Sequence, residues 1–437
     1  AKNLLGADRC ILLFESGDAI LMTENDMNKT ILRKYARLLV DTGLALRQGE
    51  TLVISAGQEG LELARIVTEY AYRRGAARVE LLFGDEAMQR LHYRYQTRDA
   101  LTSVPAWQIA RYDEMADRQV CYLALLGEDP NAFCDVDAAL LNDVARARHV
   151  ALKRYYDATT DNIIRWCLCA VPTRPWARAV FPDLSPAQAE RKLWTYILQC
   201  MRLDAPDPAA AWHAHSERLR NRANYLNERR LTALHLRSGL GTDLTVALPQ
   251  GYRFDGGAER GRNGVAFHPN MPTEEIFTSP HRLGTQGVAV ASMPLSHNGT
   301  LVRDFRIEFR DGKICSFDAR EGADCLAQLI ETDEGSHYLG EVALVGADSP
   351  IRKQNILYYN TLFDENAACH LAIGQSYPTV AGCESMSEAQ RLEIGLNRSH
   401  THVDFMIGTD DMYADGIDAD GNRIPILRDG RFVAEAE

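Results

Sequence analysis

The sequence predicts two folds in succession: an α/β N-terminal domain with a parallel sheet, followed by an α+β C-terminal domain. Through about residue 170, short apolar strands alternate with helical segments. From about residue 231, short strand-like segments follow one another instead. The first pattern is typical of a parallel sheet covered by helices on both faces, and the second is typical of a domain built mainly on sheets.

The chain divides into three segments in this interpretation. Residues 1–28 show short apolar stretches broken by Gly and Asp, and we expect an N-terminal extension that forms a small hairpin. Residues 29–230 form the α/β domain, which ends in a long helical region at about 185–230. Residues 231–437 form the α+β domain, which we expect to be the catalytic one.

Periodicity supports each element of the first domain. Apolar residues from Leu32 to Val40 fall on one face of a helix that starts near Asn28. We predict strands at 51–55, 77–84 and 120–127, and helices at 61–74 and 136–148. In the second domain, the segments "LTALHLRS", "DLTVALP", "GVAVASMPL" and "VRDFRIEFRDGKICSF" indicate strands.

Composition excludes several classes of partner. The 437 residues are 46% hydrophobic and 25% charged, which is ordinary for a globular protein, and the formal net charge is -12. No basic cluster with interleaved aromatic residues occurs, so we expect no nucleic-acid partner. No apolar run approaches the 18 or so residues of a membrane span, and we expect no membrane partner. The ten cysteines include no C-x-x-C pair, which indicates reduced thiols and a cytoplasmic protein.

Two motifs suggest ligands but have simpler explanations. Residues 55–65, "SAGQEGLELAR", place glycines between a strand and a helix, where a phosphate could bind, but the third glycine of a nucleotide motif is missing. We interpret them as turn glycines and keep nucleotide binding as an alternative. Asp418, Asp420 and Asn422 have calcium-loop spacing without the glutamate at the twelfth position, so the segment is interpreted as a series of β-hairpins.

Four stretches of the second domain carry polar residues in apolar surroundings: "NMPTEEIFTSP", "EGSHYLGEVALVG", "NTLFDENAACHLAIGQSYP" and "NRSHTHVDFMIG". In an extended first stretch, Glu274 and Glu275 point to opposite sides, so at most one of them serves a given site. Glu341 opens an apolar strand in the second, and His370 lies in the apolar "AACHLAIG" of the third, with Tyr377 seven residues later. Singly, each has a simpler explanation as a solvated carboxylate or a core histidine.

The fourth stretch is the most informative. In a strand, His402 and Asp404 share one face, with Cα atoms about 7 Å apart. An unpaired Asp404 entering the apolar "FMIG" would cost several kcal/mol to bury, and a cation would remove that cost. Together the four stretches supply carboxylates and imidazoles suited to two divalent cations about 3.5–4 Å apart. Mixed imidazole and carboxylate ligation without a thiolate favours Zn²⁺, Co²⁺ or Mn²⁺, with Mg²⁺ as an alternative.

These motifs resemble those of the aminopeptidase T family of metallopeptidases, also called the thermophilic aminopeptidase or aminopeptidase S family. The resemblance lies in "NMPTEEIFTSP", "LGEVALV", "YNTLFDENAACHLAIG" and "HVDFMIG", and it extends over residues 29–437. It implies five metal ligands and one catalytic tyrosine, which are Glu275, Glu341, His370, His402, Asp404 and Tyr377. It also implies a homodimer with a largely enclosed active site.

The resemblance selects Glu275 over Glu274, and it leaves His400 as a neighbour on the same strand face. His337 departs from the family pattern, and we expect it either to line the site or to cover it. Residues 1–28 precede the usual family start, and no role is inferred for them.

The expected reaction is hydrolysis of the N-terminal peptide bond of a short peptide with a free amino group. Two metals would activate a water, Tyr377 would stabilise the oxyanion, and Glu341 would bridge the metals, because one shared ligand lets five residues supply three ligands to each metal. The alternatives are a two-metal hydrolase of another small ester or amide, and a non-catalytic protein that binds metal or nucleotide.

Overall fold

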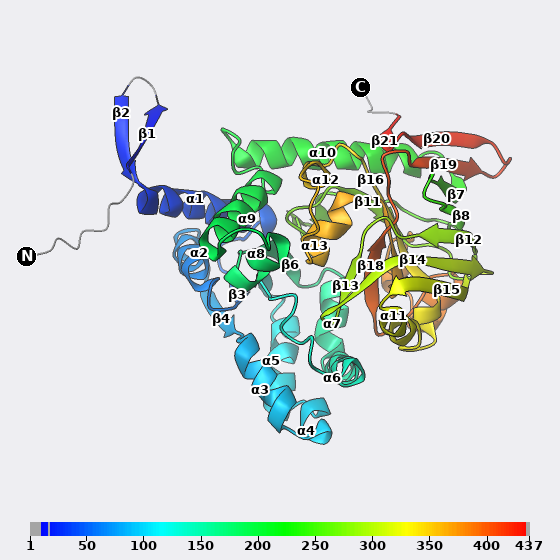
Figure 1. Cartoon of the computed structure of the whole chain (residues 1–437), viewed down its shortest axis with the longest axis horizontal. Helices are drawn as coiled ribbons and strands as arrows, with labels where there is room; N and C mark the ends of the chain where they lie inside the picture. Colours follow the sequence, from blue (N-terminus) through cyan, green and yellow to red (C-terminus); the bar gives the residue numbers. More distant parts are fainter. Residues whose placement is uncertain (1–9, 16–17, 434–437) are drawn as a thin grey trace, which may run out of the picture.

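The computed structural model describes residues 10–15 and 18–433. In Figure 1, a parallel-sheet region drawn in blue to green lies beside an antiparallel region drawn in green to red. The chain starts with a hairpin, β1 (Cys10–Glu15) and β2 (Asp18–Thr23), so the expected hairpin in the extension is confirmed within the described residues. Helix α1 begins at Glu24 rather than near Asn28, so the proposed boundary at residue 28 lies inside a helix.

The first region contains a four-stranded parallel sheet. Its strands lie in the order β4 (Arg78–Phe83), β3 (Thr51–Ala56), β5 (Cys121–Leu126) and β6 (Arg165–Ala170). The three predicted strands are confirmed. Strand β6 was not predicted, because its sequence, RWCLCA, begins with Arg and Trp and follows no clear turn motif.

Helices cover both faces of this sheet, as predicted. Along β3, Leu52 and Ile54 pack into the core cluster that contains α1 (Glu24–Leu38) and α2 (Leu61–Arg73), while Val53 packs with the opposite cluster. That second cluster includes residues of α5 (Ala106–Asp117) and α7 (Lys153–Thr160). The other helices of this part are α3 (Glu86–Tyr95), α4 (Arg98–Thr102), α6 (Ala138–Ala151) and α8 (Arg174–Val180).

Two long helices form the predicted helical region, α9 (Pro186–Cys200) and α10 (Pro208–Asn227). Helix α10 runs along the top of the molecule in Figure 1 and joins the two cores. Trp212, near its start, packs into the core of the parallel sheet, whereas Leu219 and Leu226 pack into the core of the antiparallel region. This helix therefore fixes one region against the other.

The second region contains a nine-stranded antiparallel sheet. Its strands are β7 (Leu231–Arg237), β8 (Asp243–Ala247), β12 (Thr285–Val290), β13 (Leu295–His297), β14 (Thr300–Arg310), β15 (Lys313–Glu321), β19 (Tyr413–Asp418), β20 (Arg423–Arg428) and β21 (Arg431–Phe432). Strands β19 and β20 form the predicted hairpin, and Asp418 Oδ1 accepts hydrogen bonds from the backbone N–H groups of Asp420 and Asn422 inside its turn. The calcium-like spacing therefore belongs to a turn.

A smaller antiparallel sheet lies beside it. Its strands lie in the order β11 (Glu275–Thr278), β16 (Leu339–Val345), β17 (His370–Gly374) and β18 (His402–Met406). Short elements connect the strands of this region: β9 (Glu259–Arg260), β10 (Ala266–Phe267), α11 (Ala323–Ile330), α12 (Pro350–Lys353), α13 (Thr361–Asp364) and α14 (Glu388–Glu393). All four polar stretches singled out in the sequence contribute a strand to this sheet.

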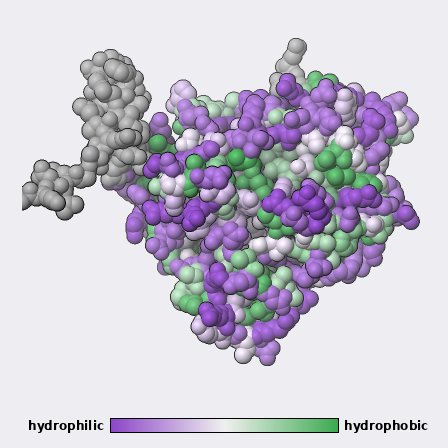
Figure 2. All heavy atoms as spheres, in the orientation of Figure 1, coloured by the Kyte–Doolittle hydropathy of each residue, from purple (hydrophilic) through white to green (hydrophobic). Residues whose placement is uncertain are grey.

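The surface agrees with the composition. Figure 2 shows a face that is mostly hydrophilic, with smaller hydrophobic areas between the charged ones, as expected for a chain with a net charge of -12. Among the described residues, the structure contains no helix that combines the length and the apolar character needed to cross a membrane.

Candidate metal centre

The register of the four-stranded sheet brings the five predicted ligands to one face. Glu341 on β16 lies opposite Ala372 on β17, which in turn lies opposite Asp404 on β18. Two rows further along, Ala343 pairs with His370. Paired residues point to the same side of a sheet, as do residues two apart in one strand. Glu341, Asp404 and His370 therefore share a face with His402, two residues before Asp404.

The first strand completes the set. Glu275 pairs with Val345, which is two residues beyond Ala343 and so on the same face. The other face of the sheet is apolar, and Val342, Leu371 and Phe405 pack there into the core of the antiparallel region. This alternation explains why polar ligands occur in sequences that otherwise resemble buried strands.

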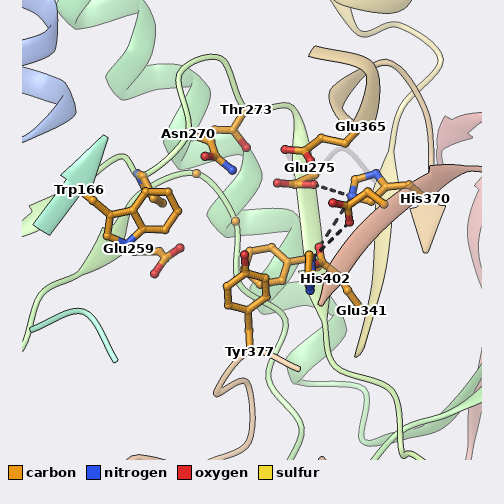
Figure 3. A pocket seen from close by; sticks show the side chains of 15 residues that line it. Trp166, Glu259, Asn270, Thr273, Glu275, Glu341, Glu365, His370, Tyr377 and His402 are labelled. Atoms are coloured by element: carbon orange, nitrogen blue, oxygen red, sulfur yellow. Dashed lines mark ion pairs between the residues drawn. The ribbon is translucent and has the colours of Figure 1, made fainter. Parts of the chain in front are cut away.

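The side chains form two overlapping groups, which Figure 3 shows from close by. Nε2 of His370 lies 3.0 Å from Glu275 Oε2 and 3.7 Å from Glu341 Oε1. Nε2 of His402 lies 3.3 Å from Glu341 Oε2 and 3.4 Å from Asp404 Oδ1. The ligand atoms of each group lie within 4.8 Å of one another, and Glu341 belongs to both groups through its two different oxygens.

Both imidazoles are oriented through their other nitrogen. His370 Nδ1 lies 3.0 Å from the Ala368 carbonyl oxygen, and His402 Nδ1 lies 2.7 Å from the Gln375 carbonyl oxygen. A carbonyl only accepts, so Nδ1 carries the proton and donates in both rings. In the neutral rings Nε2 then presents its lone pair to the carboxylates, which is the arrangement typical of metal-ligating histidines.

The electrostatics of the site fit bound cations. Fifteen residues line the cavity, and among these described residues are five carboxylates and two histidines, without a Lys or Arg. Glu275 Oε2 is buried, and His370 Nε2 lies 3.0 Å from it. Burial raises the pKa of Glu275 despite the opposing effect of His370. Burial alone would lower the pKa of His370, but Glu275 and Glu341 raise it well above its usual value. Divalent cations would satisfy this excess of negative charge.

The adjacent glutamates of the first strand have different surroundings. Glu275 faces the cavity, whereas Glu274 Oε1 lies 2.6 Å from Arg202 Nη2 and Glu274 Oε2 lies 3.6 Å from His215 Nε2. The expectation that the two point to opposite sides is confirmed. Glu274 is therefore occupied by a buried ion pair and is not available to the cavity.

Tyr377 lies at the edge of the carboxylate and imidazole group. Its ring packs edge-on against Phe277 and His402, with centroid distances of 5.7 and 5.1 Å. Burial and the charges of Glu341 and Asp404 raise its pKa well above the usual value, so the hydroxyl keeps its proton. Among the described residues the hydroxyl has no hydrogen-bond partner, and it lines the cavity as a free donor.

Glu365 also lies in the cavity, and it was not singled out from the sequence. It belongs to a 3₁₀ turn, Glu365–Ala367, and lies beside Glu275 in Figure 3. Burial raises its pKa well above the usual value, and the charges of Asp404 and Glu275 raise it further. The nearby Asn366 side chain accepts from the Glu274 N–H and donates to Glu365. The sequence offers one signal that could have indicated Glu365: it is a carboxylate a few residues before the predicted ligand His370.

Two histidines that were left open in the sequence lie outside the cavity lining. His400 precedes β18 rather than lying in it, and its exposed ring packs against His149 at a centroid distance of 5.6 Å. The expectation that it neighbours the ligands on the same strand face is therefore wrong, because the strand starts only at His402. His337 ends a 3₁₀ turn, with Nε2 3.8 Å from Glu331, and does not line the cavity.

The glycine-rich turn after β3 opens on a separate crevice at the carboxyl ends of the parallel strands. Its charged lining residues within the described part of the chain are Glu59, Asp85, Glu86 and Glu128. An acidic lining repels phosphate. The geometry therefore does not favour the nucleotide alternative.

The antiparallel sheet gathers carboxylates and imidazoles on one buried face, which is the donor set that metal-dependent hydrolases use. Comparison with known proteins identifies the family. The model of the thermophilic metalloprotease (M29) family matches residues 28–432, and the chain belongs to this family. Aminopeptidase T from Thermus thermophilus is 40% identical over 408 residues, which cover 93% of this chain and 100% of that protein. Aminopeptidase AmpS from Bacillus subtilis is 38% identical over 403 residues, covering 92% and 98%. The family predicted from the motifs is confirmed.

Comparison with solved structures supports the same family and fold. The structure of wild-type AmpT from Thermus thermophilus superposes with a TM-score of 0.86 at 38% identity, and covers 93% of this chain and 100% of that one. A 2,5-dihydroxypyridine dioxygenase from Pseudomonas putida KT2440 matches with a TM-score of 0.51 at 11% identity over 94% of this chain and 99% of that one. That second likeness shows the fold alone, so the reaction has to be argued from the site.

Proposed function

We propose that the protein is a metal-dependent aminopeptidase that hydrolyses the N-terminal peptide bond of short peptides with two divalent metal ions. The single observation that carries the two-metal proposal is the position of Glu341, whose two oxygens face different imidazoles. Membership of a metalloprotease family and the aminopeptidase names of its relatives support the reaction class.

The proposed ligands are Glu275, Glu341 and His370 for one ion, and Glu341, His402 and Asp404 for the other. When bound, the ions would supply Lewis-acid polarisation of the scissile carbonyl and lower the pKa of a water molecule. The donor set of carboxylate and imidazole groups suits Zn²⁺, Co²⁺ or Mn²⁺ and also admits Mg²⁺.

The chain's own residues would orient the substrate and stabilise charge. The Tyr377 hydroxyl, protonated and without a protein partner, is placed to donate a hydrogen bond to the developing oxyanion. Glu341 would hold both ions, and Glu365, which lines the cavity beside Glu275, would accept the proton of the attacking water and return it. The acidic cavity would attract the free amino group of a peptide.

Location and assembly follow as further parts of the proposal. The nine cysteines from Cys121 to Cys383 are free thiols, which suits a reducing compartment such as the cytoplasm. We also expect a homodimer, as the family resemblance implies.

The test is a comparison of blocked and free substrates. The purified protein, incubated with Co²⁺ or Zn²⁺, should release p-nitroaniline from leucine p-nitroanilide but not from its N-acetyl derivative. Equal turnover of both substrates would favour the alternative, a hydrolase of other small esters or amides. A protein that binds no metal and gains no activity from added Co²⁺ or Zn²⁺ would contradict the proposal.

A further inference from the structure

The wall of the cavity opposite the proposed metal ligands carries a second polar group. Figure 3 shows Trp166 and Glu259 across the cavity from His370, with Asn270 between the two sides. These three residues line the same cavity as the proposed ligands but belong to neither candidate metal group. Their role is therefore separate from holding the metal ions.

This wall is built where the two regions of the protein meet. The segment before β11 adds to the edge of the parallel sheet, because Leu168 N donates to the Pro269 carbonyl at 2.7 Å and Met271 N donates to the Leu168 carbonyl at 3.0 Å. Leu168 and Asn270 form an isolated parallel bridge. Trp166, on β6, is thereby held near Asn270, and Glu259 comes from the short strand β9.

The polar atoms of this wall are incompletely satisfied. Asn270 Oδ1 and Trp166 Nε1 are buried and have no hydrogen-bond partner in the described part of the chain. Among the described residues, the Glu259 carboxylate has one such partner, the Asn162 side-chain amide, which donates to Oε2 at 2.5 Å. No Lys or Arg forms an ion pair with Glu259 within the same residues. Buried polar atoms nearly always have a hydrogen-bond partner, so these atoms are available to a ligand or a water molecule in the cavity.

The chemistry of the wall selects a cation. Glu259 and Asn270 Oδ1 are hydrogen-bond acceptors for the N–H groups of a cation, and the Trp166 ring offers an aromatic face of the kind on which ammonium and guanidinium groups stack. Trp166 Nε1 is a hydrogen-bond donor, so it would require an acceptor atom rather than the cation itself. Burial raises the pKa of Glu259 to about 7, despite the hydrogen bond from Asn162. A positively charged ligand would stabilise the ionised carboxylate.

We propose that Glu259, Asn270 and Trp166 form a subsite that binds a positively charged nitrogen group of the peptide substrate. The group is either the α-ammonium or the basic side chain of the first residue, since both present N–H donors with a positive charge. This inference rests on the proposed aminopeptidase function and names the feature of the substrate that the site recognises.

The experiment compares Glu259→Gln with the wild type in the metal-loaded enzyme. Gln keeps the shape and can still accept from Asn162 while it removes the charge. The substrates are the p-nitroanilides of norleucine, leucine, lysine and arginine. Loss of a charge-assisted hydrogen bond should raise KM by about tenfold with little change in kcat. An increase for all four substrates assigns the α-ammonium, and an increase for lysine and arginine alone assigns the side chain.

Two further variants keep the result interpretable. Glu393→Gln, at an exposed position outside the cavity, removes the same charge and should leave every KM unchanged. Glu259→Asp keeps the charge at a shorter reach and should recover part of the affinity. Unchanged KM values for all substrates in a folded Glu259→Gln protein would overturn the proposal.

A binding measurement separates this inference from the proposed function. Titration calorimetry with n-butylammonium and n-butylguanidinium chloride should detect binding to the wild type that weakens by about tenfold in Glu259→Gln. The uncharged 1-butanol should bind neither protein. If the wild type binds these cations but hydrolyses none of the aminoacyl substrates, the aminopeptidase function fails and the cation subsite stands. If it hydrolyses the substrates and Glu259→Gln changes neither binding nor KM, the subsite fails alone.

Discussion

Glu341 and Asp404 lie in one row of the four-stranded sheet, two strands apart, with only the methyl group of Ala372 between them. The small side chain leaves room above the sheet, and the carboxylates on either side face the same imidazole, His402, at 3.3 and 3.4 Å. The spacing of one half of the proposed metal centre is therefore set by strand pairing rather than by loops. Sites built on strands are held more rigidly than sites on loops.

The first prediction concerns the shared carboxylate. Glu341→Gln removes the charge that both proposed metal groups use, and we expect bound metal to fall from two ions per chain to one or fewer. We expect kcat/KM on leucine p-nitroanilide to fall by at least about 100-fold. Mutation of a residue that only hydrogen-bonds to a metal ligand costs up to about 100-fold in activity, and loss of a ligand itself should cost at least as much. Elemental analysis of the purified protein measures the metal content. Two retained ions with full activity would exclude a bridging role.

The second prediction concerns Tyr377. Tyr377→Phe removes a hydroxyl that has no described hydrogen-bond partner, so the free energy of unfolding should change by less than about 1 kcal/mol. If the hydroxyl donates to the oxyanion, kcat should fall by about 10²–10³-fold while KM and metal content stay constant. Steady-state kinetics and a thermal melt test both parts. A loss confined to KM would instead assign Tyr377 to substrate binding.

The adjacent glutamates provide a third prediction with its own control. Glu275→Gln should abolish metal binding at one position and reduce activity. Glu274→Gln leaves the Arg202 guanidinium without its partner at 15% side-chain exposure, and should lower the free energy of unfolding by about 3 kcal/mol. The metal content of the Glu274 variant should stay normal. Identical metal loss in both variants would show that the two residues do not have separate roles.

Much of this site could be predicted from the sequence because strand geometry is local. Alternation alone places His402 and Asp404 on one face and separates Glu274 from Glu275, and the structure agrees on both. Which strands lie side by side depends on long-range pairing, so the closeness of His370 to Glu275 could not be derived from their separate segments. The family resemblance supplied that information.

The residues that were missed lie where no periodicity applies. Glu365 belongs to a 3₁₀ turn, and Glu259 belongs to a two-residue strand. Strand β6 was missed as well, although it carries Trp166 and forms the edge to which residues 269–271 add. These residues reach the cavity only through contacts between segments that are far apart in the chain, and a single sequence does not predict such contacts.

Metal removal provides a fourth prediction. Without cations, the buried carboxylates of the cavity repel one another, so chelation by EDTA should lower the melting temperature. A ligand present at a thousandfold excess over its Kd contributes about 4 kcal/mol, which is several degrees for a chain of this size. Readdition of Zn²⁺, Co²⁺, Mn²⁺ or Mg²⁺ should restore both stability and activity, and the ranking of the four ions measures selectivity. A metal-free protein with an unchanged melting temperature would contradict this account of the cavity.

The last prediction tests the row that holds Glu341 and Asp404 apart. Ala372→Val adds two methyl groups in a position with no solvent exposure, directly between the two carboxylates. Overpacking of this kind costs about 1–3 kcal/mol of stability, and the extra volume should push the carboxylates away from His402. Metal affinity and kcat should therefore fall more than the loss of stability explains. The matched control is Leu371→Ile on the apolar face of the same strand, where a swap that conserves volume should cost less than about 1.5 kcal/mol and leave metal binding intact. If Ala372→Val binds two metal ions as tightly as the wild type, the spacing of the carboxylates is set elsewhere, and the row of the sheet does not control the site.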